Sequence, residues 1–137
     1  MANVLKTERD GDVAITEIQA TLTLGCGLKE SMKELAQAGV KCLILDFSNV
    51  AEIDSAGLGE LIAGHVSMTQ AGGSTILLNV SRLSKDLLRL TRLSALFPTY
   101  NGAASIVRGV IANRTADRRS RAEREAEPRM LSEVYLG

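Results

Sequence analysis

The spacing of apolar positions changes along the chain in a way that predicts strands and helices in turn. Residues 1–9 and 13–18 carry short apolar patterns on either side of Asp10-Gly11-Asp12, a strong turn signal, and so predict a hairpin. The apolar run in residues 41–47 is too continuous for a one-sided strand and predicts a strand buried on both faces. Residues 20–24 continue extended, residues 74–80 predict a further strand, and residues 96–100, with Pro98, fit only an edge strand or an extended link.

Between these segments, apolar residues recur at spacings of three and four, which predicts helices. The expected helices cover residues 28–37, residues from 55 to about 72, a segment capped by Ser81, and a last segment through residues 106–111. The faces expected to be buried in the first three are Leu28, Met32, Leu35 and Ala36; Leu58, Leu61, Ile62 and Val66; and Leu83, Leu87, Leu90 and Ser94, with Leu88 adjacent. Alternation of strands and helices favours an α/β fold with parallel neighbours, mixed because of the opening hairpin.

The composition changes at Asn113, which suggests a domain boundary. Residues 114–129 have almost no apolar side chains beyond alanine and are dense in both charges, so they cannot bury enough surface to offset their ordering entropy. We therefore expect a folded domain over residues 1–113 and a charged C-terminal extension over 114–137, either helical or disordered. An apolar patch in residues 130–136 would form a loose terminus, or a contact with a partner or a second copy in a homodimer.

Composition and charge exclude several classes of function. Aromatic residues make up only 3% of the chain, too few for a module that stacks nucleic-acid bases, and the net charge is zero, so we expect no direct binding of nucleic acid. There is no apolar run that could span a membrane and no signal-peptide layout, so we expect a cytoplasmic protein without membrane contact. Cys26 and Cys42 should stay reduced, and with a single histidine, His65, no zinc site or other cofactor site is expected.

Ser55 is the candidate functional residue, because it stands between the buried strand and the second helix. A serine hydrolase is disfavoured: Ile53 occupies the place of the first glycine of an esterase elbow. His65 lies ten residues along the same helix, about 15 Å of rise away. A nucleotide site is weakly indicated, since no phosphate-binding glycine motif is present and only the helix N-terminus with Gly57 and Gly59 would serve. The residues alone leave two readings open: Ser55 only caps the helix, or it accepts a phosphate that switches an exposed surface.

The sequence around Ser55 resembles a known family. Asp54-Ser55-Ala56-Gly57-Leu58-Gly59, with the preceding strand at residues 43–50, resembles the signature of STAS domains of the anti-sigma factor antagonist type. Similarity extends to residues 11–15, to Ala71-Gly72-Gly73 and to residues 93–100, and covers about residues 3–112. The resemblance implies a STAS fold, with a mixed four- to five-stranded sheet, an N-terminal hairpin and about four flanking helices.

The resemblance also implies a partner-switching role without catalysis. An unphosphorylated antagonist binds an anti-sigma factor that is also a serine kinase, the kinase phosphorylates the serine of the motif, and a serine phosphatase reverses this. Carried over residue by residue, Ser55 is the phosphate acceptor, and the residues that bind the partner are Asp54, Ser55, Ala56, Gly57 and Leu58. The alternative role is that of a STAS scaffold or sensor module in a stress-signalling or transporter-associated complex.

The segment after the second strand departs from the family pattern. Many antagonists carry an aspartate there, near the acceptor serine, whereas this chain has Thr23. Thr23 is neutral and is a candidate for a second phosphate acceptor. The change bears on whether the partner is a standard anti-sigma factor kinase.

Overall fold

The computed structural model of the protein describes residues 5–19, 22, 26–103 and 109. The chain divides into two compact units, Met1–Ala104 and Ser105–Gly137, and every element named below belongs to the first. The last predicted helix, apart from residue 109, the C-terminal extension and the apolar patch at residues 130–136 lie outside the described residues. So do Thr23 and most of the extended segment at residues 20–24.

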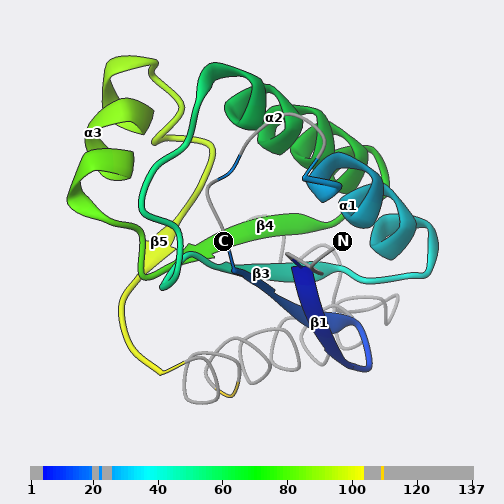
Figure 1. Cartoon of the computed structure of the whole chain (residues 1–137). Coiled ribbons are helices and arrows are strands. Elements are labelled where there is room, and N and C mark those ends of the chain that lie inside the picture. The colour runs from blue at the N-terminus through cyan, green and yellow to red at the C-terminus, as the bar shows by residue number, and fades with distance from the viewer. Residues whose placement is uncertain (1–4, 20–21, 23–25, 104–108, 110–137) are drawn as a thin grey trace, which may run out of the picture. The chain divides into compact units, whose positions relative to one another are not determined.

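A mixed five-stranded sheet forms the centre of this unit (Figure 1). Its spatial order follows the chain order, from β1 (Leu5–Asp10) through β2 (Val13–Ile18), β3 (Cys42–Asp46) and β4 (Ser74–Leu78) to β5 (Thr99–Tyr100). The turn at Asp10-Gly11-Asp12 joins β1 and β2 in an antiparallel hairpin, and the other neighbours are parallel. The predicted hairpin, the parallel strands and the short edge strand after Pro98 are therefore confirmed.

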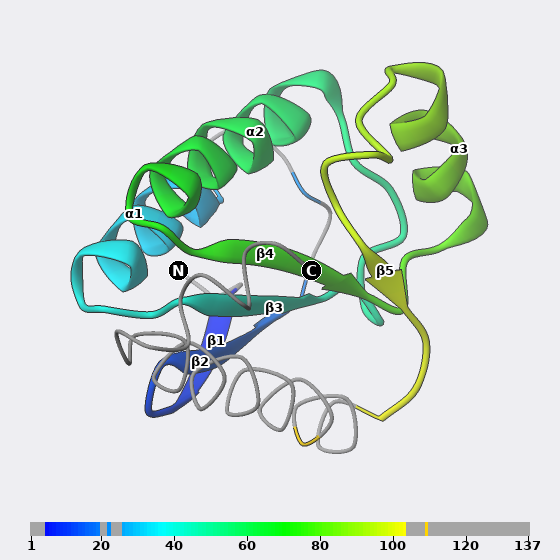
Figure 2. The same ribbon diagram turned by 180° about the vertical axis from the view of Figure 1, so that it is seen from behind.

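Three helices accompany the sheet in the described part of the chain: α1 (Leu28–Gln37), α2 (Ser55–Gln70) and α3 (Arg82–Leu90). Figures 1 and 2 show α1 and α2 side by side along one face of the sheet, with α3 beyond the β5 edge. α1 and α2 are each followed by a glycine in the left-handed region, Gly39 at φ 94° and Gly72 at φ 80°, which favours ending a helix. This architecture confirms the predicted α/β class, with a mixed sheet that opens on a hairpin.

The central strand is apolar on both faces, as its sequence predicted. Leu43, Ile44 and Leu45 are fully buried, and Cys42 is buried at the start of the strand. Leu43 and Leu45 belong to the main core with Met32 of α1 and Leu61 of α2. Because β3 lies in the middle of the sheet, the segment that follows it leaves from a rigid position.

Two of the predicted helix faces were wrong in part. In α2, Val66 is 46% exposed, because about 100° of rotation per residue places it about 140° around the helix from Leu61. The buried face of α2 instead consists of Gly57, Leu58, Leu61, Gly64 and Met68.

In α3, the predicted stripe points largely to solvent: Leu83 is 63% and Leu90 78% exposed, and Ser94 is also exposed. The helix packs instead through Ser84 and Leu88, which are four residues apart and share a neighbouring stripe. Spacing alone identifies both stripes but cannot say which one meets the core.

Candidate functional site

The segment between β3 and α2 is held by buried side chains before it reaches the surface. Phe47, Val50 and Ile53 are between 1% and 8% exposed, so they anchor the segment along its length. Ile53 also forms an isolated parallel bridge with Leu22, in which Leu22 N donates to Glu52 O (3.2 Å) and Asp54 N donates to Leu22 O (3.1 Å). The start of α2 is therefore attached both to the core and to the backbone at Leu22.

Asp54 caps α2. Its backbone is extended, and its Oδ1 accepts a hydrogen bond from Gly57 N at 2.7 Å, which satisfies one of the amide groups left without a partner at a helix start. Ser55 is the first residue inside the helix, and its hydroxyl forms no hydrogen bond within the described part of the chain. The reading in which Ser55 itself caps the helix is therefore wrong, because Asp54 performs that role.

The five residues predicted to bind a partner differ in exposure. Asp54 and Ser55 are exposed and Ala56 is half-buried, whereas Gly57 and Leu58 are buried on the core side of the helix. Sequence reasoning grouped them because they are consecutive. The helix separates them, since consecutive residues point about 100° apart.

Gly59, one turn along from Ser55, is exposed. A Cβ atom built on it would meet no heavy atom of the described residues within 4 Å. Within the described part of the chain, the position one turn from Ser55 therefore carries no side-chain bulk.

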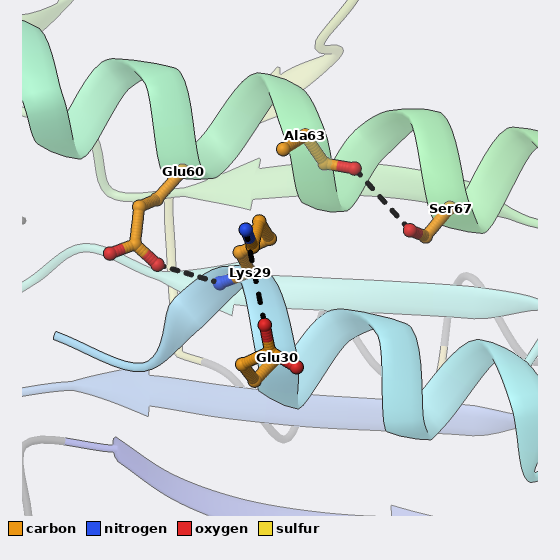
Figure 3. A network of polar contacts seen from close by, with 5 residues as sticks. All are labelled: Lys29, Glu30, Glu60, Ala63 and Ser67. Carbon is orange, nitrogen blue, oxygen red and sulfur yellow. Dashed lines mark hydrogen bonds and ion pairs between the residues drawn. The ribbon is translucent and has the colours of Figure 1, made fainter. Parts of the chain in front are cut away.

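Glu60 is a positioning residue that the sequence analysis did not single out. Its Oε1 accepts a hydrogen bond from Lys29 N at 3.2 Å, so a side chain of α2 binds the first turn of α1 (Figure 3). The residue before α1, Gly27, has no side chain to cap that helix. Because glycine at position 27 cannot cap the helix, the amide groups of its first turn need a hydrogen-bond acceptor from another element. This absence of a capping side chain was the one signal in the sequence that pointed to such a contact.

The lone histidine lies on α2 away from the candidate site. The His65 ring meets the Phe97 ring edge-on, with centroids 4.8 Å apart, and Phe97 is fully buried. Its Nδ1 is buried, and no hydrogen bond to it is found within the described residues. His65 thus packs from α2 against the segment before β5. It is the only histidine in the sequence, so no histidine is placed to act as a catalytic base for Ser55.

Two further findings concern the described residues alone. They contain no group of three or more histidine, cysteine, aspartate or glutamate side chains arranged to hold a metal ion. Nor does any helix among them have the length and apolar character needed to cross a membrane.

Comparisons with known proteins agree with the fold described above. The family model of the STAS domain matches residues 5–106, and no curated protein matches the sequence. The anti-sigma factor antagonist SpoIIAA in its unphosphorylated form superposes with a TM-score of 0.65 at 16% identity, covering 80% of this chain and 96% of that one. SpoIIAA of Bacillus in the phosphorylated form gives 0.65 at 16% identity, covering 78% and 98%. An anti-sigma-factor antagonist (STAS) domain protein of Planctomyces limnophilus gives 0.66 at 15%, covering 79% and 97%.

Proposed function

We propose that this chain, which belongs to the STAS domain family, is a cytoplasmic phosphorylation switch of the anti-sigma factor antagonist type. In the unmodified state it binds an anti-sigma factor that is also a serine kinase. Phosphorylation of Ser55 releases the partner, and a serine phosphatase restores binding. The chain itself supplies no catalytic group to this cycle.

The observation that carries the proposal is the environment of the Ser55 hydroxyl. It is exposed at the first residue of a rigidly held helix, and it is not needed for capping, because Asp54 accepts from Gly57 N. A kinase can therefore reach the hydroxyl without opening the fold. Loss of the hydroxyl proton on modification breaks no hydrogen bond within the described part of the chain.

The position also tolerates the added charge. A phosphate contributes about −1.5 to −2 charges at neutral pH, and the N-terminal end of a helix favours anions. The first turn of α2 contains no acidic residue, although the Asp54 carboxylate lies immediately before it. The fold should therefore remain while the local surface becomes strongly anionic. Equal TM-scores with the two SpoIIAA forms support the view that one fold serves both states.

Release of the partner follows from the shape of the surface. Asp54 and Ser55 are exposed, and the open space at Gly59 lets another backbone approach closely. In such a contact a phosphate would be desolvated and brought against the partner, which costs binding free energy. Gly57 and Leu58 contribute indirectly, because they are buried on the core side of α2 and hold the helix in place.

The test compares the unmodified chain, Ser55→Ala and Ser55→Asp as baits in extracts of the source cells, with mass spectrometry of the captured proteins. A serine kinase should be captured by the first two and lost with the third, and calorimetry with the purified kinase should show at least about a tenfold weaker affinity for Ser55→Asp. Ser74→Asp is the matched control, since it adds the same charge at an exposed residue at the start of β4.

Equal capture of one partner by all baits would contradict the switch and favour the scaffold role. Equal affinities of the Ser55→Ala and Ser55→Asp variants for the purified kinase would do the same.

A further inference from the structure

Helix α3 carries an exposed leucine stripe. Leu83 and Leu90 are 63% and 78% exposed, and Leu87 lies half-buried between them. Spacings of four and three place the three side chains on one face. Scattered surface leucines are ordinary, but three that share one face of a short helix place apolar surface side by side, which is a feature of interaction sites.

The patch borders a hollow rather than a flat surface. A cavity of about 270 Å³ opens between α3 and the segment before α2, and its lining is Glu52, Ile53, Leu83, Ser84, Asp86, Leu87 and Leu90. Four of its seven lining residues are isoleucine or leucine, and two carry carboxylates. A space of this size suits an apolar side chain that projects from a partner.

The other flank of α3 is basic. A second hollow of about 310 Å³ there is lined by Arg82, Lys85, Asp86, Leu88, Arg89, Ser94, Phe97 and Thr99. Asp86 pairs with Arg89 at 3.0 Å, and no ion pair of Arg82 or Lys85 occurs in the described part of the chain. The helix thus presents an apolar stripe next to positive charge that is not neutralised.

We propose that α3 is a docking site for an acidic amphipathic helix of a partner protein. An apolar side chain of that helix enters the hollow between Ile53 and Leu87, and its carboxylates face Arg82 and Lys85. This surface includes Glu52 and Ile53 of the segment that leads to Ser55, and it adds a second contact to the proposed function, on which it rests.

Two other occupants fit the surface less well. A second copy docked through the same face would bring Arg82, Lys85 and Arg89 against their own counterparts, because a twofold interface pairs each patch with itself. An anionic membrane presents no protruding side chain and could not fill a concave space of about 270 Å³ as a partner side chain does.

The experiment uses the full chain and two synthetic helical peptides of about 18 residues, long enough to form helix. Both peptides carry leucines on one face; one has glutamate at the remaining charged positions and the other has lysine. Calorimetry should show binding of the acidic peptide and at least about tenfold weaker binding of the basic one, with a loss of affinity at high salt. Amide shifts in NMR spectra should change in α3 and at Ile53.

The Leu83→Ser, Leu90→Ser double variant should abolish peptide binding. Val66→Ser, which also replaces an exposed apolar side chain by serine but lies on α2, should leave binding unchanged. Circular dichroism of both variants checks that they fold. Equal binding of the two peptides, or binding that survives the leucine changes, would overturn the proposal. So would binding to phosphatidylserine vesicles in place of the acidic peptide, or a dimer that the double variant disrupts.

Discussion

Replacing Gly64 by alanine should destabilise the protein, although alanine is the better helix former. Gly64 is buried in α2 where this helix packs on α1. An added Cβ would lie 2.2 Å from Met32 Sδ, 2.9 Å from its Cβ and 3.0 Å from its Cε. The thioether can rotate away, but the Cβ of Met32 is fixed to the backbone of α1, so one helix must shift.

The expected size follows from two opposing terms. Overpacking of a dense core costs about 1–3 kcal/mol, since Met32 is fully buried and has little room to yield. Exchange of glycine for alanine inside a helix returns about 1 kcal/mol. We therefore expect Gly64→Ala to lower the free energy of unfolding by about 1 kcal/mol, and α2, with Ser55 at its start, to be held less firmly.

Gly59 provides the matched control within the same helix. It is exposed, and a Cβ there would meet none of the described residues within 4 Å, so Gly59→Ala should raise the free energy of unfolding by about 0.5–1 kcal/mol. Urea denaturation measures both changes, provided that the dependence of the free energy of unfolding on urea concentration is the same in each variant. Addition of Met32→Ala should cost less in the Gly64→Ala background than in the native chain, by about 1 kcal/mol in a double-mutant cycle. Stabilisation by both alanines, or an additive cycle, would refute the close approach of the two helices.

Two further substitutions test single hydrogen-bonding groups. Asp54→Ala should lower the free energy of unfolding by about 1 kcal/mol in urea titrations, because the cap on Gly57 N is lost, while Asp54→Asn, which can still cap, should change it by only a few tenths; equal losses would contradict the capping role. Thr75→Val should raise the free energy of unfolding by about 1 kcal/mol in the same titrations, because the buried Thr75 Oγ1 has no hydrogen-bond partner within the described residues. The buried Thr16, whose Oγ1 bonds to that of Thr7 at 2.8 Å, is the control, and Thr16→Val should not stabilise.

Local signals in the chain were enough to predict most of the architecture. Contacts between residues near one another in sequence determine the turn at Asp10-Gly11-Asp12 and the bounds of α1. The apolar run of β3 was recognisable because nearly every residue of this strand is buried. The position of Ser55 at a helix start belongs to the same class, because a carboxylate before a helical pattern is a local capping signal.

Choices between equivalent local patterns required the fold. α3 offers two stripes at helical spacing, and only its packing selects Leu88 over Leu83 and Leu90. The acceptor for Lys29 N comes from Glu60, 31 residues away, and the need for glycine at position 64 arises from Met32 of another helix. Periodicity states which side chains share a face, but a face is buried only when another element covers it. That depends on long-range contacts, which no window of local sequence contains.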